Sequence, residues 1–148
     1  PLMFADNSTN TCVKYCPADQ NFFADNITRK CVLNCSSGLF SEVQSRTCVK
    51  TCPKNLETYA DPTTRVCQPT CPATYYASDV TKECVKVCPD EPVKTYAHIN
   101  KCLQMCPEGY YGENTTRTCR TDCSNVADIF ADDTTNLCVT TCPVGLFA

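Results

Sequence analysis

The sequence predicts a small disulfide-rich repeat array that is elongated and built mostly of loops and turns, with short β-strands and little or no helix. Of its 148 residues, 16 are cysteine, against one histidine and no tryptophan. The cysteines fall in eight Cys-x-x-x-Cys pairs that recur every 17 to 19 residues. The chain between the pairs is too short for stable helices and is rich in Pro, Asp, Asn and Thr, which favour turns.

Such a cysteine content is typical of a disulfide scaffold. Disulfides at this density persist in oxidising compartments, whereas cytosolic thiols stay reduced. The sequence therefore predicts an extracellular or cell-surface location.

Charge and hydropathy exclude two classes of partner. The net charge is −3, and the 13 basic and 16 acidic residues are scattered along the chain. No basic patch favours nucleic acid, and no stretch approaches the roughly 20 apolar residues of a membrane span. We expect no nucleic-acid partner and no membrane span in this segment.

Each repeat has one consensus, Cys-Pro, a spacer, then aromatic-Ala-Asp-x-x-Thr-x-x-Cys. We use "spacer" for the residues between the second cysteine of a pair and the next aromatic residue. Recurring apolar positions usually build an interior, so we expect the aromatics to pack against disulfides rather than to form a recognition stripe. The aromatic stands eight residues before the first cysteine of a pair, or six before it at Tyr96, and is Phe4, Phe23, Phe40, Tyr59, Tyr76, Tyr96, Tyr111 or Phe130.

Long and short repeats alternate. From the second cysteine to the next aromatic the distance runs 7, 5, 7, 5, 8, 5, 7, 5 residues. We therefore expect residues 1–148 to form one continuous array of about eight repeats, or four double repeats of about 36 residues, in which neighbours stack. Phe147-Ala148 has the phase of Phe4-Ala5, so we expect a segment of a longer chain or one subunit of a filament.

The spacing limits the disulfide pairing. In a strand the two cysteines of a pair lie about 13 Å apart, whereas a disulfide needs Cβ atoms about 4 Å apart. Pairing between neighbouring pairs is therefore expected. The crossed connectivity, for example Cys12 with Cys31 and Cys16 with Cys35, fits the length alternation as well as a connectivity that closes each spacer. We prefer the spacer-closing connectivity. It leaves Cys12 and Cys142 to pair with adjoining repeats or subunits, and joins Cys16 to Cys31, Cys35 to Cys48, Cys52 to Cys67, Cys71 to Cys84, Cys88 to Cys102, Cys106 to Cys119 and Cys123 to Cys138.

Four Asn-x-Ser/Thr sequons occur, at Asn7, Asn26, Asn34 and Asn114. Three of them, Asn7, Asn26 and Asn114, share one position at the polar tip of the repeat, where a glycan can project into solvent. We expect N-glycosylation there, although Asn and Thr also form simple turns. Asn34 is a weaker candidate because its sequon includes a half-cystine.

The sequence gives little support for a metal site or a catalytic site. Zinc thiolates usually stand two residues apart, whereas the spacing here is three, and His98 is alone in the irregular repeat. Asp25, Asp61, Asp79 and Asp132 recur singly, without the clustered oxygens that calcium requires, and are expected to cap turns. No Ser/His/Asp set, paired carboxylates or glycine-rich phosphate loop is recognisable. We expect no catalytic residue, no metal and no cofactor.

Two segments carry a family resemblance. Residues 48–53, Cys-Val-Lys-Thr-Cys-Pro, and 106–116, Cys-Pro-Glu-Gly-Tyr-Tyr-Gly-Glu-Asn-Thr-Thr, resemble the furin-like repeats of growth-factor-receptor cysteine-rich domains. The single-disulfide modules of that class imply the spacer-closing connectivity. Over the whole chain the pattern is more similar to cysteine-rich surface repeat proteins of ciliates and other protists, including immobilisation antigens. Ser36 and Ser124, in place of the proline, depart from this pattern.

The resemblance and the uniform units favour a non-enzymatic structural protein of an extracellular filament or cell-surface coat. We expect it to be glycosylated and to associate with itself or continue head to tail. The alternative is a ligand-binding or adhesive receptor-like ectodomain, in which the irregular repeat at 89–101 carries specificity. A disulfide-rich protease inhibitor is a third hypothesis, and it requires one exposed, strained loop.

Overall fold

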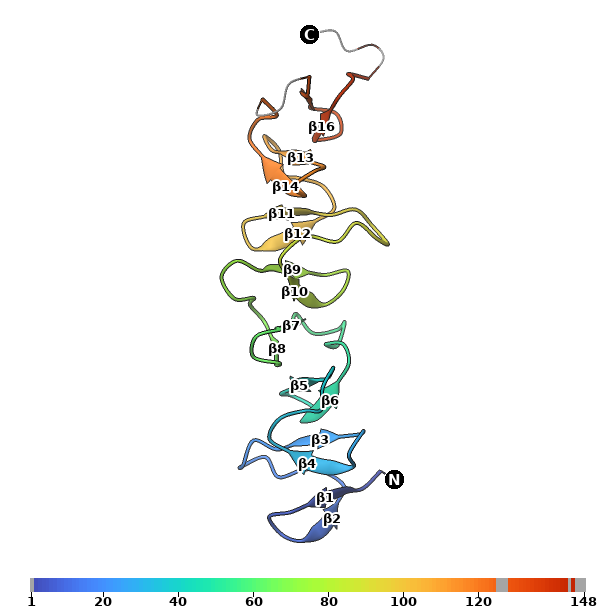
Figure 1. Ribbon diagram of the computed structural model, residues 1–148, viewed down its shortest axis with the longest axis vertical. Helices are drawn as coiled ribbons and strands as arrows, with labels where there is room; N and C mark the ends of the chain where they lie inside the picture. Colours follow the sequence, from blue (N-terminus) through green and yellow to red (C-terminus); the bar gives the residue numbers. More distant parts are fainter. Residues whose placement is uncertain (1, 125–127, 144, 146–148) are drawn as a thin grey trace. The chain divides into compact units, whose positions relative to one another are not determined.

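The computed structural model describes residues 2–124, 128–143 and 145, which form short β-strands and turns (Figure 1). In these residues there are sixteen strands of two or three residues and no helix. The expected fold class, a small disulfide-rich repeat fold with little or no helix, is confirmed. The strands are β1 (Phe4–Asp6), β2 (Thr11–Val13), β3 (Phe23–Asp25), β4 (Lys30–Val32), β5 (Phe40–Glu42), β6 (Thr47–Val49), β7 (Tyr59–Ala60), β8 (Cys67–Gln68), β9 (Tyr76–Ser78), β10 (Glu83–Val85), β11 (Tyr96–His98), β12 (Lys101–Leu103), β13 (Tyr111–Glu113), β14 (Thr118–Arg120), β15 (Phe130–Asp132) and β16 (Leu137–Val139).

One repeat forms one antiparallel hairpin. The aromatic-small-acid triplet is the first strand, and the triplet centred on the cysteine is the second, as in β1 and β2, where Phe4 lies opposite Val13 and Ala5 opposite Cys12. The same register recurs in β3–β4, β5–β6, β7–β8, β11–β12, β13–β14 and β15–β16. Aromatic and β-branched residues favour such strands, so each hairpin follows directly from its repeat.

The chain divides into two compact units, Pro1–Pro72 with Thr81–Cys84, and Ala73–Val80 with Val85–Ala148. In the first unit the strand order is β2-β1-β4-β3-β6-β5, and β7 lies beside both β8 and β10. In the second unit the order is β15-β16-β13-β14-β11-β12-β9. Within each unit the first strand of one hairpin is parallel to the second strand of the next, so that consecutive hairpins stack (Figure 1).

Seven disulfides hold the hairpins to the spacers before them. Their Cα atoms are 5.5–5.7 Å apart, and the sequence separations of 15, 13, 15, 13, 14, 13 and 15 reproduce the alternation of spacer lengths. Cys12 and Cys142 have free, exposed thiols. The bonds are those of the spacer-closing connectivity: Cys16–Cys31, Cys35–Cys48, Cys52–Cys67, Cys71–Cys84, Cys88–Cys102, Cys106–Cys119 and Cys123–Cys138.

The hydrophobic core is divided into small clusters between neighbouring hairpins. Phe4 of the first hairpin packs with Cys16 and Cys31, the disulfide of the next one. The same relation joins Phe23 to Cys35 and Cys48, Phe40 to Cys52 and Cys67, and Tyr76 to Cys88 and Cys102. The expectation that the aromatics cover disulfides is thus confirmed for Phe4, Phe23, Phe40 and Tyr76, and the disulfide that each of these rings covers belongs to the following hairpin.

The irregular repeat forms the tightest hairpin. Between β11 and β12 only Ile99 and Asn100 remain as a loop, and Ile99 has φ 56 and is 84% exposed. A β-branched residue rarely adopts this left-handed conformation. His98 stands where most repeats have an acid, and its ring packs edge-on against Tyr110 with the centroids 4.6 Å apart.

Candidate functional site: the junctions between hairpins

The contacts that repeat from hairpin to hairpin are concentrated at the junctions. At each of seven junctions the backbone N–H of the residue after the aromatic in a first strand donates to a carbonyl in the next hairpin, at 2.7–2.9 Å. The accepting residue stands two positions before the cysteine of that hairpin. The donor–acceptor pairs are Ala5–Arg29, Ala24–Arg46, Ser41–Arg65, Ala60–Lys82, Ala77–Asn100, Ala97–Arg117 and Gly112–Asn136.

Most accepting residues are left-handed, with φ between 55 and 62 at Arg29, Arg46, Arg65, Lys82, Arg117 and Asn136. This conformation closes the hairpin loop, because the N–H of Arg29 donates to the carbonyl of Asp25 at 2.8 Å, and that of Arg65 to the carbonyl of Asp61 at 2.9 Å. Asn tolerates the left-handed region, whereas longer side chains adopt it at a cost. At Arg46, Arg65, Lys82 and Arg117 contacts of the side chain help to offset that cost, whereas the side chain of Arg29 is exposed.

Arg117 shows these side-chain contacts most fully. Its guanidinium lies over the ring of Tyr96, 5.1 Å from the centroid, and the residue is only 8% exposed. Its Nη2 atom donates to the carbonyl of Pro89 at 2.8 Å and to that of Thr95 at 2.8 Å, and its Nε atom donates to Thr95 at 3.2 Å. Nη1 also pairs with the carboxylate of Asp90. One side chain thus joins two consecutive hairpins.

Other junctions repeat the arrangement with fewer bonds. In each, a side chain reaches back to a spacer carbonyl of the preceding hairpin, and at Arg46, Arg65 and Lys82 it also covers the preceding aromatic ring at 5.0–5.9 Å. The hydrogen bonds are Arg46 to Pro17 at 3.1 Å, Arg65 to Ser36 at 2.8 Å and to Leu39 at 2.6 Å, Lys82 to Leu56 at 3.3 Å, and Asn136 to Cys106 at 3.1 Å.

Sequence reasoning missed this position, although a signal was present. The residue two before the first cysteine of every pair is Arg, Lys or Asn: Asn10, Arg29, Arg46, Arg65, Lys82, Asn100, Arg117 and Asn136. From the sequence alone, a cationic residue at the end of a polar loop is expected to be solvated. Its partners are carbonyls 22 to 30 residues earlier, which a short-range pattern does not reveal.

The acid at the end of each first strand caps the hairpin loop. Asp61, which is fully buried, accepts the N–H of Thr63 at 2.8 Å and the hydroxyl of Thr64 at 2.7 Å. Asp25 accepts the N–H of Ile27 at 2.8 Å, and Asp132 accepts the N–H of Thr134 at 2.9 Å. The predicted turn-capping role of Asp25, Asp61 and Asp132 is confirmed.

Asp79 does not stand where the other capping acids stand, and its turn-capping role stays a prediction. Ser78, which is fully buried, occupies the end of β9 where other repeats place the capping acid. Asp79 follows one residue later, and its side chain is 58% exposed and lies 4.0 Å from the Nζ atom of Lys101. The repeat has the usual eight residues from Tyr76 to Cys84, so Ser78 replaces the acid and Asp79 occupies the next position. Glu42 and Glu113 hold that position in their repeats.

Hydrogen bonding holds the capping carboxylates in the charged form. Burial raises the pKa of Glu113, but bonds from Thr116 and Thr115 outweigh it and lower the pKa from 4.5 to about 2. Burial also raises the pKa of Asp25 and of Asp61, but their hydrogen bonds lower it by more, so that both pKa values lie below the ordinary value. The carboxylates are therefore structural anions, with their oxygens turned into the loop.

Acid should open the loop that Glu113 caps. Because the pKa of Glu113 is lower in the folded than in the unfolded chain, its stabilisation is fully present above pH 4.5 and is lost as the pH falls toward about 2. We expect amide exchange at Thr115 and Thr116, corrected for intrinsic rates, to accelerate through this window. Glu113→Gln should raise the rate at pH 6 and remove most of the pH dependence. An unchanged pH profile in that variant would contradict the assignment.

The predicted glycosylation sites lie on the hairpin surface. Asn7, Asn26, Asn34 and Asn114 are all exposed, and all but Asn34 follow a capping acid directly. The Oδ1 atom of Asn114 accepts the hydroxyl of Tyr96 at 2.9 Å, which leaves its Nδ2 atom available. Asn34 precedes the Cys35–Cys48 disulfide.

The described residues contain few features suited to chemistry. In the first unit, a hollow of about 750 Å³ is lined by Phe4, Tyr15, Ala18 and Ala24 among others, with Lys14 and Arg46 as its charged side chains. No cluster of three or more His, Cys, Asp or Glu side chains is arranged to hold a metal within 2–124, 128–143 and 145. That same part of the chain contains no helix with the length and hydrophobicity needed to cross a membrane.

The chain was compared with family models, with curated proteins and with solved structures, and none of the three comparisons found a match.

Proposed function

We propose that this chain is a non-enzymatic structural segment of an extracellular filament or cell-surface coat, stapled by disulfides and glycosylated. The observation that carries the proposal is the junction. Seven times the same backbone bond joins one hairpin to the next, and most of these junctions add a side chain that reaches back to the preceding spacer. A fold whose recurrent contacts join similar units to one another is suited to carrying load or covering a surface.

The disulfides support an extracellular site of action. Seven cystines in 148 residues are typical of secreted or extracellular proteins. Glycans at Asn7, Asn26 and Asn114, with Asn34 as a weaker fourth site, would project from the hairpin loops and shield the backbone from proteases. Cys12 and Cys142 would bond to adjoining repeats or subunits.

Native material tests this proposal. Immunogold labelling with an antibody against the chain should mark an outer coat or filaments. Mass spectrometry with and without reduction should show the seven spacer-closing crosslinks and glycan mass on the three tip asparagines. Label confined to the cytoplasm, or a full complement of free thiols, would overturn the proposal.

One observation favours the alternative of a ligand-binding or adhesive ectodomain. Ile99 projects from the irregular hairpin with 84% exposure and a backbone conformation that β-branched residues avoid. A soluble partner that is retained by the chain, and lost when residues 89–101 are replaced by a regular repeat, would favour this function over the structural one.

A further inference from the structure

The predicted acceptor asparagines differ in what holds the hydroxyl of their sequon. N-glycosylation requires Ser or Thr two residues after the asparagine, which implies that the transferase recognises that hydroxyl. In hairpin β1–β2 the hydroxyl of Thr9 donates to Oδ2 of Asp6 at 2.8 Å. In β13–β14 the hydroxyl of Thr116 donates to the carboxylate of Glu113. Both sequon hydroxyls are therefore engaged once their hairpins have folded.

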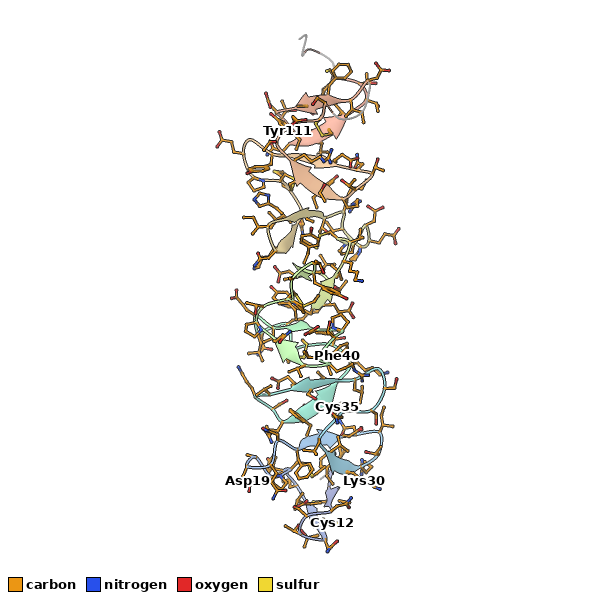
Figure 2. The ribbon with its side chains drawn as sticks, turned by 60° about the vertical axis from the view of Figure 1, so that its left-hand side comes forward. Cys12, Asp19, Lys30, Cys35, Phe40 and Tyr111 are labelled. Carbon is orange, nitrogen blue, oxygen red and sulfur yellow. A yellow bond between two sulfur atoms is a disulfide. The ribbon has the colours of Figure 1, made fainter. Side chains whose placement is uncertain are left out.

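The hydroxyl of Thr28, in the sequon of Asn26, is free. Thr28 is exposed, and within the part of the chain that the structure describes its hydroxyl has no hydrogen-bond partner. In β1–β2 a second hydroxyl, that of Thr11, lies 2.8 Å from that of Thr9, but Lys30 occupies the corresponding position at the start of β4 (Figure 2). The sequon of Asn26 thus keeps its hydroxyl available in the folded hairpin.

Ser36 explains this difference. Asp25, which caps the hairpin, is fully buried, and its Oδ1 atom accepts the N–H of Ile27 at 2.8 Å, as the acids of other loops do. Its Oδ2 atom, the counterpart of the oxygen that Thr9 binds, accepts the N–H of Ser36 at 3.2 Å and also its hydroxyl. Most repeats have proline at this position, which has neither donor. Ser36 therefore occupies the carboxylate oxygen that Thr28 would otherwise use.

The same hydrogen bond closes the acceptor site at Asn34. Ser36 is the hydroxyl residue of the Asn34 sequon, and its hydroxyl is turned toward the buried carboxylate of Asp25. Asn34 itself is exposed, so folding makes the hydroxyl unavailable and not the asparagine. One hydrogen bond thus engages the hydroxyl of one sequon and leaves that of the other free.

We propose that Ser36 determines which asparagine remains an acceptor for N-glycosylation after folding. Asn26 is modified in the folded, disulfide-bonded chain, whereas Asn34 and Asn114 are modified only before their hairpins close. Asn7, whose sequon hydroxyl is held within its hairpin, belongs with the second group. The inference rests on the glycosylation in the proposed function and assigns its order.

The transfer consumes the asparagine and not the hydroxyl. The Nδ2 atom attacks the anomeric carbon of a lipid-pyrophosphate-linked oligosaccharide, so that a C–N bond forms and the C–O bond to the pyrophosphate breaks. The lipid pyrophosphate leaves with the bonding electron pair, and the amide proton passes to a base of the transferase. Engaging the hydroxyl therefore changes the rate at which an asparagine is used and leaves the product the same.

The chain produced without glycans tests the order. Its oxidised form and its dithiothreitol-reduced form are each offered to a purified oligosaccharyltransferase with a lipid-linked oligosaccharide, and glycopeptide mass spectrometry gives the initial rate at each asparagine. The ratio of oxidised to reduced rate should be about tenfold higher at Asn26 than at Asn114, the factor expected for releasing a hydroxyl from a charged acceptor. Equal ratios at the two asparagines would overturn the inference.

Ser36→Pro restores the consensus proline and frees the carboxylate oxygen. In β7–β8, whose following spacer begins with proline, Thr64 donates to Oδ2 of Asp61 at 2.7 Å, and we expect Thr28 to bond to its own capping acid in the same way. The rate at Asn26 should then fall about tenfold in the oxidised chain and stay unchanged in the reduced chain. Intact mass should show that all seven disulfides form.

Ser124→Pro is the matched control. Ser124 also stands in place of proline, but its hydroxyl donates to Asp122 at 2.7 Å, so this substitution should leave the rates at Asn26 and Asn114 unchanged. Ser36→Ala, which removes the hydroxyl without adding a ring, should lower the rate at Asn26 in the same direction as Ser36→Pro.

An unchanged rate at Asn26 in both Ser36 variants would contradict the assignment. If the ratios at Asn26 and Asn114 are equal while native material still carries glycans and antibody still marks a coat, the order is wrong and the proposed function stands. If the tenfold difference is found while antibody label is confined to the cytoplasm, the proposed function fails and the assignment of the acceptor hydroxyls stands.

Discussion

Replacing Cys52 and Cys67 together by alanine should cost about 3 kcal/mol of local stability, the chain-entropy value for a loop of this length. Cys52 is 1% and Cys67 4% exposed, and both pack against Ala60 and Phe40. The loss of stability should therefore affect the hairpin β7–β8, which contains Cys67, and also the preceding hairpin β5–β6 through Phe40 (Figure 2).

Amide exchange read by mass spectrometry measures the effect. Exchange should accelerate on the order of a hundredfold at β5–β6 and β7–β8, since each 1.4 kcal/mol is about tenfold, and remain unchanged at β15–β16. Cys12→Ala is the matched control, because its thiol is free and exposed. Uniform acceleration along the whole chain would show that the hairpins do not act as neighbour-coupled units.

Arg117→Ala should loosen the junction between β11 and β14 by about 3 kcal/mol. Hydrogen bonds to a charged group contribute about 1.5–3 kcal/mol and a partly desolvated cation–π contact about 0.5–2, and the substitution leaves the buried carbonyl of Thr95 without its donors. The amide of Ala97, which donates to the Arg117 carbonyl across this junction, reports the change by its exchange rate.

Arg29→Ala separates the side chain's role from its place in the repeat. Arg29 has the same left-handed conformation and accepts the N–H of Ala5, but its side chain is exposed. Its removal should change the exchange of Ala5 by less than about threefold, as is usual for surface substitutions. Similar effects of the two substitutions would mean that the guanidinium contacts of Arg117 do not hold the junction.

The hairpins were predictable because their determinants are local. Phe23-Ala24-Asp25 and Lys30-Cys31-Val32 are strand triplets separated by a turn-forming stretch, and the cysteine spacing limits the connectivities to a few. The capping acids followed from the same period, except in β9, where Ser78 takes the position of the acid and Asp79 stands one residue later.

The junctions were not predictable because their partners are distant in sequence and are backbone carbonyls. Nothing in the residues near Arg65 marks Ser36 and Leu39 as its acceptors. That Phe40 covers the disulfide of the next hairpin depends on parallel stacking of first and second strands, which the consensus of one repeat does not contain.

The arrangement of rings and cystines gives the chain a direction. Phe4 shields Cys16–Cys31, Phe23 shields Cys35–Cys48, and Phe40 shields Cys52–Cys67. Unravelling one hairpin of this unit therefore bares the sulfurs of its C-terminal neighbour and not those of its N-terminal one. A reductant such as dithiothreitol should consequently reduce these disulfides one after another, beginning with the one nearest the amino-terminal side of the unit.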